Sequence, residues 1–143
     1  MTTEDANRNS PWHLWTVGIL ALLWNGSGAV TIMLAQGGRL ANISPDEAAY
    51  YAAQPTWFVI ATDIALVSAA AAGVALLRRS RAAVWLFGLS LALILFNNAY
   101  ELIAGTSRML ASRSALVLTS VIAVIAILQV VYARAMSRRA VLK

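Results

Sequence analysis

The chain has 143 residues, of which 60% are hydrophobic and 12% are charged. Soluble domains have roughly 45–50% apolar and 25% charged residues, so this composition argues against a soluble protein. Cysteine is absent and His13 is the single histidine, which excludes thiol nucleophiles, disulfides, thiolate zinc sites and multi-histidine metal sites. We therefore expect neither a cofactor nor a metal.

Four apolar runs dominate the sequence, and each is long enough to cross a bilayer, which takes about 20 helical residues. They cover residues 13–35, 57–77, 82–104 and 115–135. The turn at 78–81 is so short that the second and third spans must be antiparallel neighbours. The sequence predicts an all-α integral membrane protein, with residues 1–143 forming one up-down-up-down four-helix bundle.

The basic residues indicate the orientation, because Lys and Arg in short loops resist translocation. If both termini and turn 78–81 are cytoplasmic, only Arg39, Arg108 and Arg113 of the 11 basic residues lie outside. We therefore expect cytoplasmic N- and C-termini. The net charge of +5 arises at the span ends, and no aromatic-basic interleaving points to nucleic acid as a partner.

The loop between the first two spans has its own helix signal in the Ser-Pro-Asp-Glu sequence at 44–47. The serine is a good N-cap, the proline suits the first helical position, and the glutamate completes a capping box. With Pro55 as a stop, this pattern predicts a short helix over 45–53. Tyr50 and Tyr51 favour the headgroup layer at the outer surface, where a passive interfacial helix and a lid over the bundle are alternatives.

Small residues recur at every fourth position of the second span. They are Ala61, Ala65, Ala69 and Gly73. Such a stripe lets two helix backbones approach closely, either as a seam within the bundle or as a face between two copies of the chain.

Polar side chains inside the spans are the candidate site residues. They are Asn25, Ser27, Asp63, Asn97, Asn98 and Glu101. Asp63 lies roughly 9 Å inside the outer end of the second span, and Glu101 lies about one turn inside the outer end of the third. Glu101 shares one broad helix face with the two asparagines that precede it. An interfacial ion pair with Arg108 or Arg113 is an alternative role for Glu101.

An ionisable side chain facing lipid costs a few kcal/mol or more, so such groups normally face the bundle interior or a wet cavity. Two interpretations follow for this polar set. In the structural one, a protonated Asp63 donates across helices to Asn25 or Asn97 as a clamp. In the functional one, the polar residues surround an outward-opening pocket that binds a small polar or cationic ligand or relays a proton.

Motifs for catalysis are missing: the sequence has no Gly-x-x-x-x-Gly-Lys loop, no Gly-x-Ser-x-Gly elbow and no His-Glu-x-x-His. We therefore assign no catalytic residues and do not expect an enzyme. Minimal loops and the small-residue stripe favour an accessory or scaffold subunit that packs against a larger membrane protein. The alternative is a ligand-binding or transport protein, as a homodimer, with an outer-half polar pocket around Asp63 and Glu101.

Several segments resemble a group of small uncharacterised bacterial four-helix transmembrane proteins, some of which are named as sugar transporters. They are Pro-Trp-His-Leu-Trp at 11–15, Leu-Leu-Trp-Asn-Gly-Ser-Gly-Ala at 22–29, Ser-Pro-Asp-Glu at 44–47 and Pro-Thr-Trp at 55–57. The overall plan is also similar to that of DoxX-type proteins. The resemblance implies a location in the bacterial inner (plasma) membrane. Val30 and Thr31 depart from the acidic-aromatic pair common in the group, which weakens any site carried over in the first span.

Overall fold

The structure, a computed structural model, describes residues 12–105 and 113–142, with side chains of the second range from residue 117 onward. The described residues form only helices: α2 (Trp12–Gln36), α3 (Pro45–Ala52), α4 (Thr56–Leu77), α5 (Ala82–Ala104) and α6 (Arg113–Arg138). All but α3 are long and apolar enough to span a membrane. The predicted all-α fold is confirmed, and the long helices begin and end within three residues of the predicted spans.

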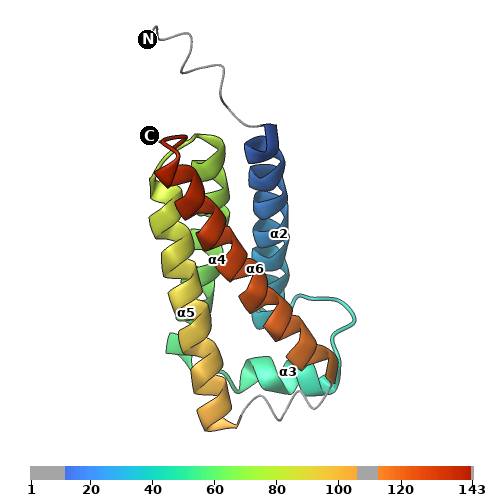
Figure 1. Cartoon of the computed structure of the whole chain (residues 1–143). Helices are drawn as coiled ribbons and strands as arrows, with labels where there is room; N and C mark the ends of the chain where they lie inside the picture. The colour runs from blue at the N-terminus through green and yellow to red at the C-terminus, as the bar shows by residue number, and fades with distance from the viewer. Residues whose placement is uncertain (1–11, 106–112, 143) are drawn as a thin grey trace, which may run out of the picture.

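The long helices form an up-down-up-down bundle (Figure 1). Helix α4 packs closely against α2 on one side and α5 on the other, and α6 packs along α5. In Figure 1, α6 runs diagonally across the bundle, and α3 lies across the end opposite the labelled C-terminus. We call this lower end the α3 end.

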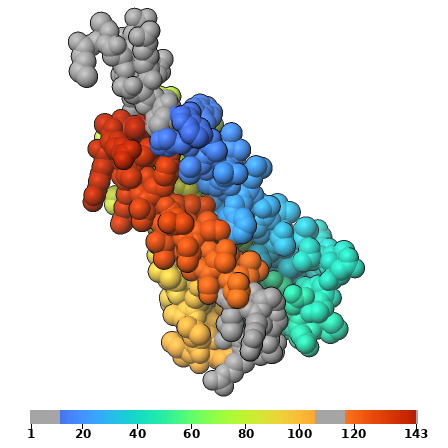
Figure 2. Space-filling model, turned by 45° about the vertical axis from the view of Figure 1, so that its right-hand side comes forward, coloured from blue at the N-terminus to red at the C-terminus, as the bar shows by residue number. Residues whose placement is uncertain are grey.

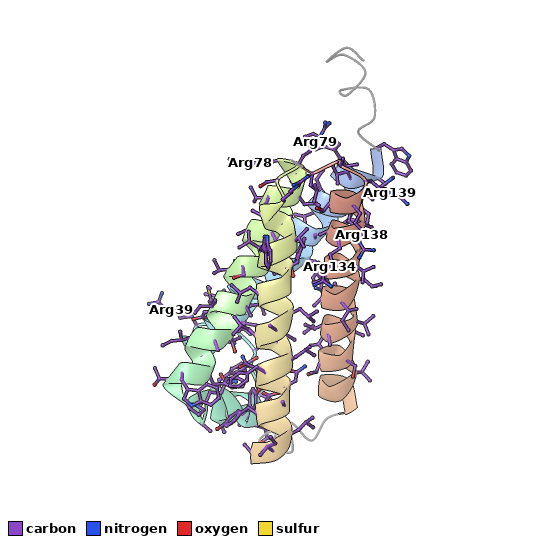
Figure 3. The ribbon with its side chains drawn as sticks, turned by 60° about the vertical axis from the view of Figure 1, so that its left-hand side comes forward. Arg39, Arg78, Arg79, Arg134, Arg138 and Arg139 are labelled. Atoms are coloured by element: carbon purple, nitrogen blue, oxygen red, sulfur yellow. The ribbon has the colours of Figure 1, made fainter. Side chains whose placement is uncertain are left out.

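The opposite end of the bundle gathers arginine side chains. Arg78 and Arg79 in the α4–α5 turn lie at this end with Arg138 and Arg139 at the end of α6, whereas Arg39 lies far from them (Figure 3). We call it the basic end. The chain after α6 folds back over the α4–α5 turn, where Arg81 Nε donates a hydrogen bond to the Leu142 carbonyl at 3.3 Å.

The hydrophobic core occupies the half of the bundle nearest the basic end. Leu14, Leu76 and Leu142 are almost completely buried, and Phe87 and Met136 pack in the same cluster. These residues come from the start of α2, the end of α4, the start of α5, the end of α6 and the segment after α6. Apolar packing therefore closes the bundle at its basic end.

The small-residue stripe of α4 is part of a seam with α2. Ala65 and Ala69 are buried, and a Cβ atom on Gly73 would lie 3.1 Å from Leu22 Cα. This contact is tighter than ordinary van der Waals contact, so glycine suits the close backbone approach. The structure confirms the seam within the bundle at Gly73, and Ala65 and Ala69 are buried within the single chain.

Helix α3 has the predicted capping box. The Ser44 side chain accepts from the Glu47 backbone N–H at 3.2 Å, and the Glu47 carboxylate accepts from the Ser44 backbone N–H at 3.0 Å. Pro45 occupies the first turn, where its missing N–H has no cost. The hydrogen bonds from Ser44 lower the pKa of Glu47 below its usual value. The helix ends at Ala52, one residue before the predicted end.

Candidate cavity at the α3 end

A cavity of about 700 Å³ lies at the α3 end of the bundle. All five helices contribute to its walls, and α3 lines it with Tyr50 and Tyr51. In Figure 2, α6 and α2 form the near face, and α3 lies beyond the lower part of α2. Small-molecule sites in proteins are typically about 300–1,000 Å³, so the cavity is large enough for a ligand.

Three of the six candidate residues predicted from the sequence line this cavity. Asn97, Asn98 and Glu101 of α5 all contribute to its wall, as their shared helix face suggested. Their half of α5 lies outside the hydrophobic core. Of the two residues around which a pocket was expected, Glu101 lines this cavity and Asp63 does not.

The two candidates of the first span do not line the cavity. Asn25 Nδ2 donates to the Ala21 carbonyl at 2.8 Å, and Ser27 Oγ donates to the Trp24 carbonyl at 3.1 Å. Both bonds stay within α2, and Ser27 is exposed on the helix surface. The backbone of α2 thus satisfies these polar groups locally.

Asp63 also lies outside the cavity lining. Its side chain is half-buried, and its Oδ1 atom is enclosed without a hydrogen-bond partner among the described residues. The predicted clamp, in which Asp63 donates to Asn25 or Asn97, is not formed: no hydrogen bond joins these side chains among the described residues, and Asn97 Oδ1 has no partner there either. The position of Asp63 in its span predicts its depth in the membrane, but it does not predict the side of α4 on which the side chain lies.

Asn97 and Thr62 form a polar connection between α5 and α4 that the sequence did not reveal. Asn97 is 7% exposed, and its Nδ2 donates to Thr62 Oγ1 at 2.9 Å. Thr62 Oγ1 gives its one proton to the Phe58 carbonyl at 2.9 Å, so it can only accept from Asn97. This network fixes the orientation of the amide, and it leaves Asn97 Oδ1 without a partner among the described residues.

A second polar connection attaches α3 to the bundle. The Tyr50 hydroxyl donates a hydrogen bond to the Glu101 carboxylate, and Tyr50 is buried in the described structure. The pKa of Tyr50 is raised mainly by burial and, to a smaller extent, by this hydrogen bond. The expected pairing of Glu101 with Arg108 or Arg113 lies outside the described side chains.

The sequence suggested Tyr50 only as a headgroup anchor, because residues 50 and 101 are far apart in the chain. No local pattern links a tyrosine of the loop helix to a carboxylate at the end of the third span. Thr62 was missed for a related reason, since a threonine in an apolar span commonly bonds its own helix backbone.

The charge of the cavity wall is negative. Asp46, Glu47 and Glu101 line it, and none of the described lining residues is a lysine or an arginine. Two further lining side chains have enclosed polar atoms without a partner among the described residues, namely Gln36 Nε2 and Gln54 Oε1. The described part of the chain has no group of three or more metal-ligating side chains. The wall therefore suits recognition by hydrogen bonds and charge.

No family model, curated protein sequence or solved structure matches the chain. The cavity and its lining are therefore the features that point to a function.

Proposed function

We propose that the protein binds a small molecule in the cavity at the α3 end, as a ligand-binding or transport protein of the membrane. The observation that carries the proposal is a cavity of about 700 Å³ whose described lining combines aliphatic side chains with the polar side chains of Asn98 and Glu101. Small-molecule sites are typically apolar hollows with a few polar groups that orient the ligand.

The proposed location is the bacterial inner membrane, with both termini in the cytoplasm and the cavity in the outer half of the bilayer. The support for this orientation is the arginine cluster at the basic end (Figure 3), because basic residues concentrate on the cytoplasmic side of membrane proteins. In this orientation, α3 covers the outer end of the bundle. Its contribution to the cavity wall favours the lid interpretation over that of a passive surface helix.

A thermal-stability screen of the purified protein in a neutral maltoside detergent tests ligand binding. The informative variant is Thr119→Trp, which places an indole in the cavity wall. Val121→Trp is the matched control, because Val121 is exposed on the same helix and does not line the cavity. We expect compounds that raise the melting temperature of the wild type and of Val121→Trp but not of Thr119→Trp. Compounds that stabilise all three proteins equally would show that binding occurs elsewhere.

The accessory-subunit hypothesis makes a different prediction, namely a stoichiometric larger partner. None of the described surfaces points specifically to such a partner, since exposed apolar side chains are also expected where a bundle faces lipid. Native mass spectrometry of the gently extracted complex separates the two functions. A reproducible heavier subunit supports the accessory role, whereas a monomer or homodimer supports autonomous ligand binding.

A further inference from the structure

We infer that the ligand of this cavity is an organic cation, with an ammonium group carried on an apolar body. The inference rests on the proposed function and names the ligand class for the same cavity. Three kinds of lining group support it: carboxylates, enclosed hydrogen-bond acceptors, and aromatic and aliphatic side chains.

The first support is the sign of the charge. The described lining residues include Asp46, Glu47 and Glu101 and no lysine or arginine, so an anion would meet only like charge. Glu101 accepts one hydrogen bond from Tyr50, whereas an ionised carboxylate has about four lone-pair sites. Glu101 therefore retains acceptor capacity for a cationic donor.

The second support is an acceptor beside Glu101 that has no partner among the described residues. Asn97 lies one helical turn before Glu101 on α5, so the two side chains are neighbours on one helix face. The Asn97 amide nitrogen donates to Thr62, and Oδ1 is enclosed without a partner among the described residues, so a ligand contacts this oxygen only when a neighbouring side chain moves. An ammonium group has three donors and no acceptor, which matches a carboxylate beside an amide oxygen.

The third support is the apolar part of the wall. Aliphatic side chains line the cavity from four helices, among them Ile32, Leu66, Ile94 and Ile122. Three aromatic side chains, Tyr50, Tyr51 and Phe58, line it as well, and aromatic faces attract cations. A small inorganic cation would leave these surfaces unused, whereas an amphiphilic amine would contact both the acidic and the apolar parts.

Matched probes test the class of ligand. Phenylbutylammonium, phenylbutanol and phenylbutyrate share one apolar body and differ in the charge of the head. We measure their affinities by calorimetry at neutral pH for the full chain in maltoside, with Thr119→Trp and Val121→Trp as the cavity and surface variants. We expect phenylbutylammonium to bind at least about tenfold more tightly than the other two, with binding lost in Thr119→Trp and kept in Val121→Trp.

Two carboxylate variants locate the charge that matters. Glu101→Gln should reduce the preference for phenylbutylammonium over phenylbutanol by about tenfold, while the glutamine oxygen still accepts from Tyr50 and keeps α3 attached. If Glu101→Gln does not fold, Asp46→Asn, at an exposed position, replaces it as the carboxylate variant. Asp63→Asn is the charge control, because Asp63 does not line the cavity, and it should leave both affinities unchanged.

The source of the cation is a separate arm of the experiment. Propylammonium tests the head without the body, and hexadecylammonium, which partitions into the micelle, tests delivery from the membrane. Displacement of phenylbutylammonium by hexadecylammonium supports the inferred class with a membrane-dissolved ligand. If propylammonium binds tightly and phenylbutylammonium does not, the requirement for an apolar body is overturned.

The outcomes distinguish a wrong ligand class from a wrong proposed function. If phenylbutanol or phenylbutyrate binds as tightly as phenylbutylammonium, and Thr119→Trp abolishes the binding, the cavity binds ligands but the cationic class is wrong. If none of the probes binds, the cationic class is also wrong, and the stability screen decides the proposed function. If Thr119→Trp binds the probes as the wild type does, both are wrong.

Discussion

At the scale of single residues, Asp63 illustrates how burial and hydrogen bonding assign a role that sequence cannot. Its Oδ1 atom is enclosed without a partner among the described residues, and it lies outside the cavity lining. An apolar replacement removes the cost of that buried polar atom. We therefore expect Asp63→Leu to raise the free energy of unfolding by about 1 kcal/mol, measured by denaturant unfolding in detergent. Loss of ligand binding in Asp63→Asn would contradict this placement and return Asp63 to the site.

Tyr50 is the residue that fixes α3 over the cavity. Tyr50→Phe removes the hydroxyl that donates to Glu101, and hydrogen bonds to charged groups contribute about 1.5–3 kcal/mol. We expect faster amide hydrogen exchange across residues 45–52, with the core of the basic half unchanged. Tyr51→Phe is the control, because the Tyr51 hydroxyl makes no hydrogen bond with any described residue. Equal effects of the two variants would show that the Tyr50–Glu101 bond does not hold α3.

The raised pKa of Tyr50 gives the same bond a pH dependence. The folded pKa lies above the usual value of 10.0 because of burial and the bond to Glu101. The contribution of Tyr50 to stability is thus fully present below pH 10.0, and it is lost as the pH rises through the folded pKa. At physiological pH the attachment of α3 is therefore insensitive to this group.

At the scale of the element, α3 should respond to acid through its capping box. The pKa of Glu47 is lowered from 4.5 by hydrogen bonds from Ser44. The resulting stabilisation is present above 4.5 and is lost as the pH falls through the folded pKa. We expect exchange protection of residues 45–52, corrected for the intrinsic rate, to fall in that acidic range. Glu47→Gln should flatten this pH dependence, and an unchanged acid response in that variant would contradict the role of the cap.

The seam between α2 and α4 makes a prediction about packing. A Cβ atom on Gly73 would meet backbone atoms of Leu22 at 3.1 to 3.2 Å, and backbone cannot move aside as a flexible side chain can. Gly73→Leu should therefore destabilise the fold by about 1–3 kcal/mol, as overpacking does. Gly88→Leu on α5 is the matched control, because a Cβ there meets nothing within 4 Å. Similar melting temperatures for the two variants would contradict the close approach.

The helices could be predicted because the sequence patterns that indicate them are local. Apolar runs longer than about 20 residues indicate spans regardless of partners, and the capping box of α3 is contained within Ser44 to Glu47. The cavity was only partly predictable. Sequence placed Asn97, Asn98 and Glu101 on one face of a helix, but Tyr50 and Thr62 join them through tertiary contacts. Which side of α4 faces which neighbour depends on the packed bundle, so sequence alone did not show that Asp63 lies outside the described lining of the cavity.

At the scale of the whole molecule, the two halves of the bundle differ in packing. The basic half holds the core around Leu14, Leu76 and Phe87, and His13 Nδ1 lies 2.7 Å from the Tyr132 hydroxyl, which joins α2 to α6 there. The α3 half holds the cavity instead. The packed basic half supports the α3 half, which contains the cavity. A binding protein requires such support, because packing elsewhere must hold the walls of a site in place.

The orientation of these two halves in the membrane can be measured directly, because the chain has no cysteine. Single cysteines at exposed positions report their side of the membrane through a membrane-impermeant maleimide on spheroplasts. We expect Ser44→Cys at the α3 end to react in intact spheroplasts and Arg139→Cys at the basic end to react only after lysis, because the arginines of the basic end resist translocation. The reverse pattern would place the cavity in the cytoplasmic half of the bilayer. A ligand would then reach the cavity from the cell interior, and the search for it would move to cytoplasmic amines.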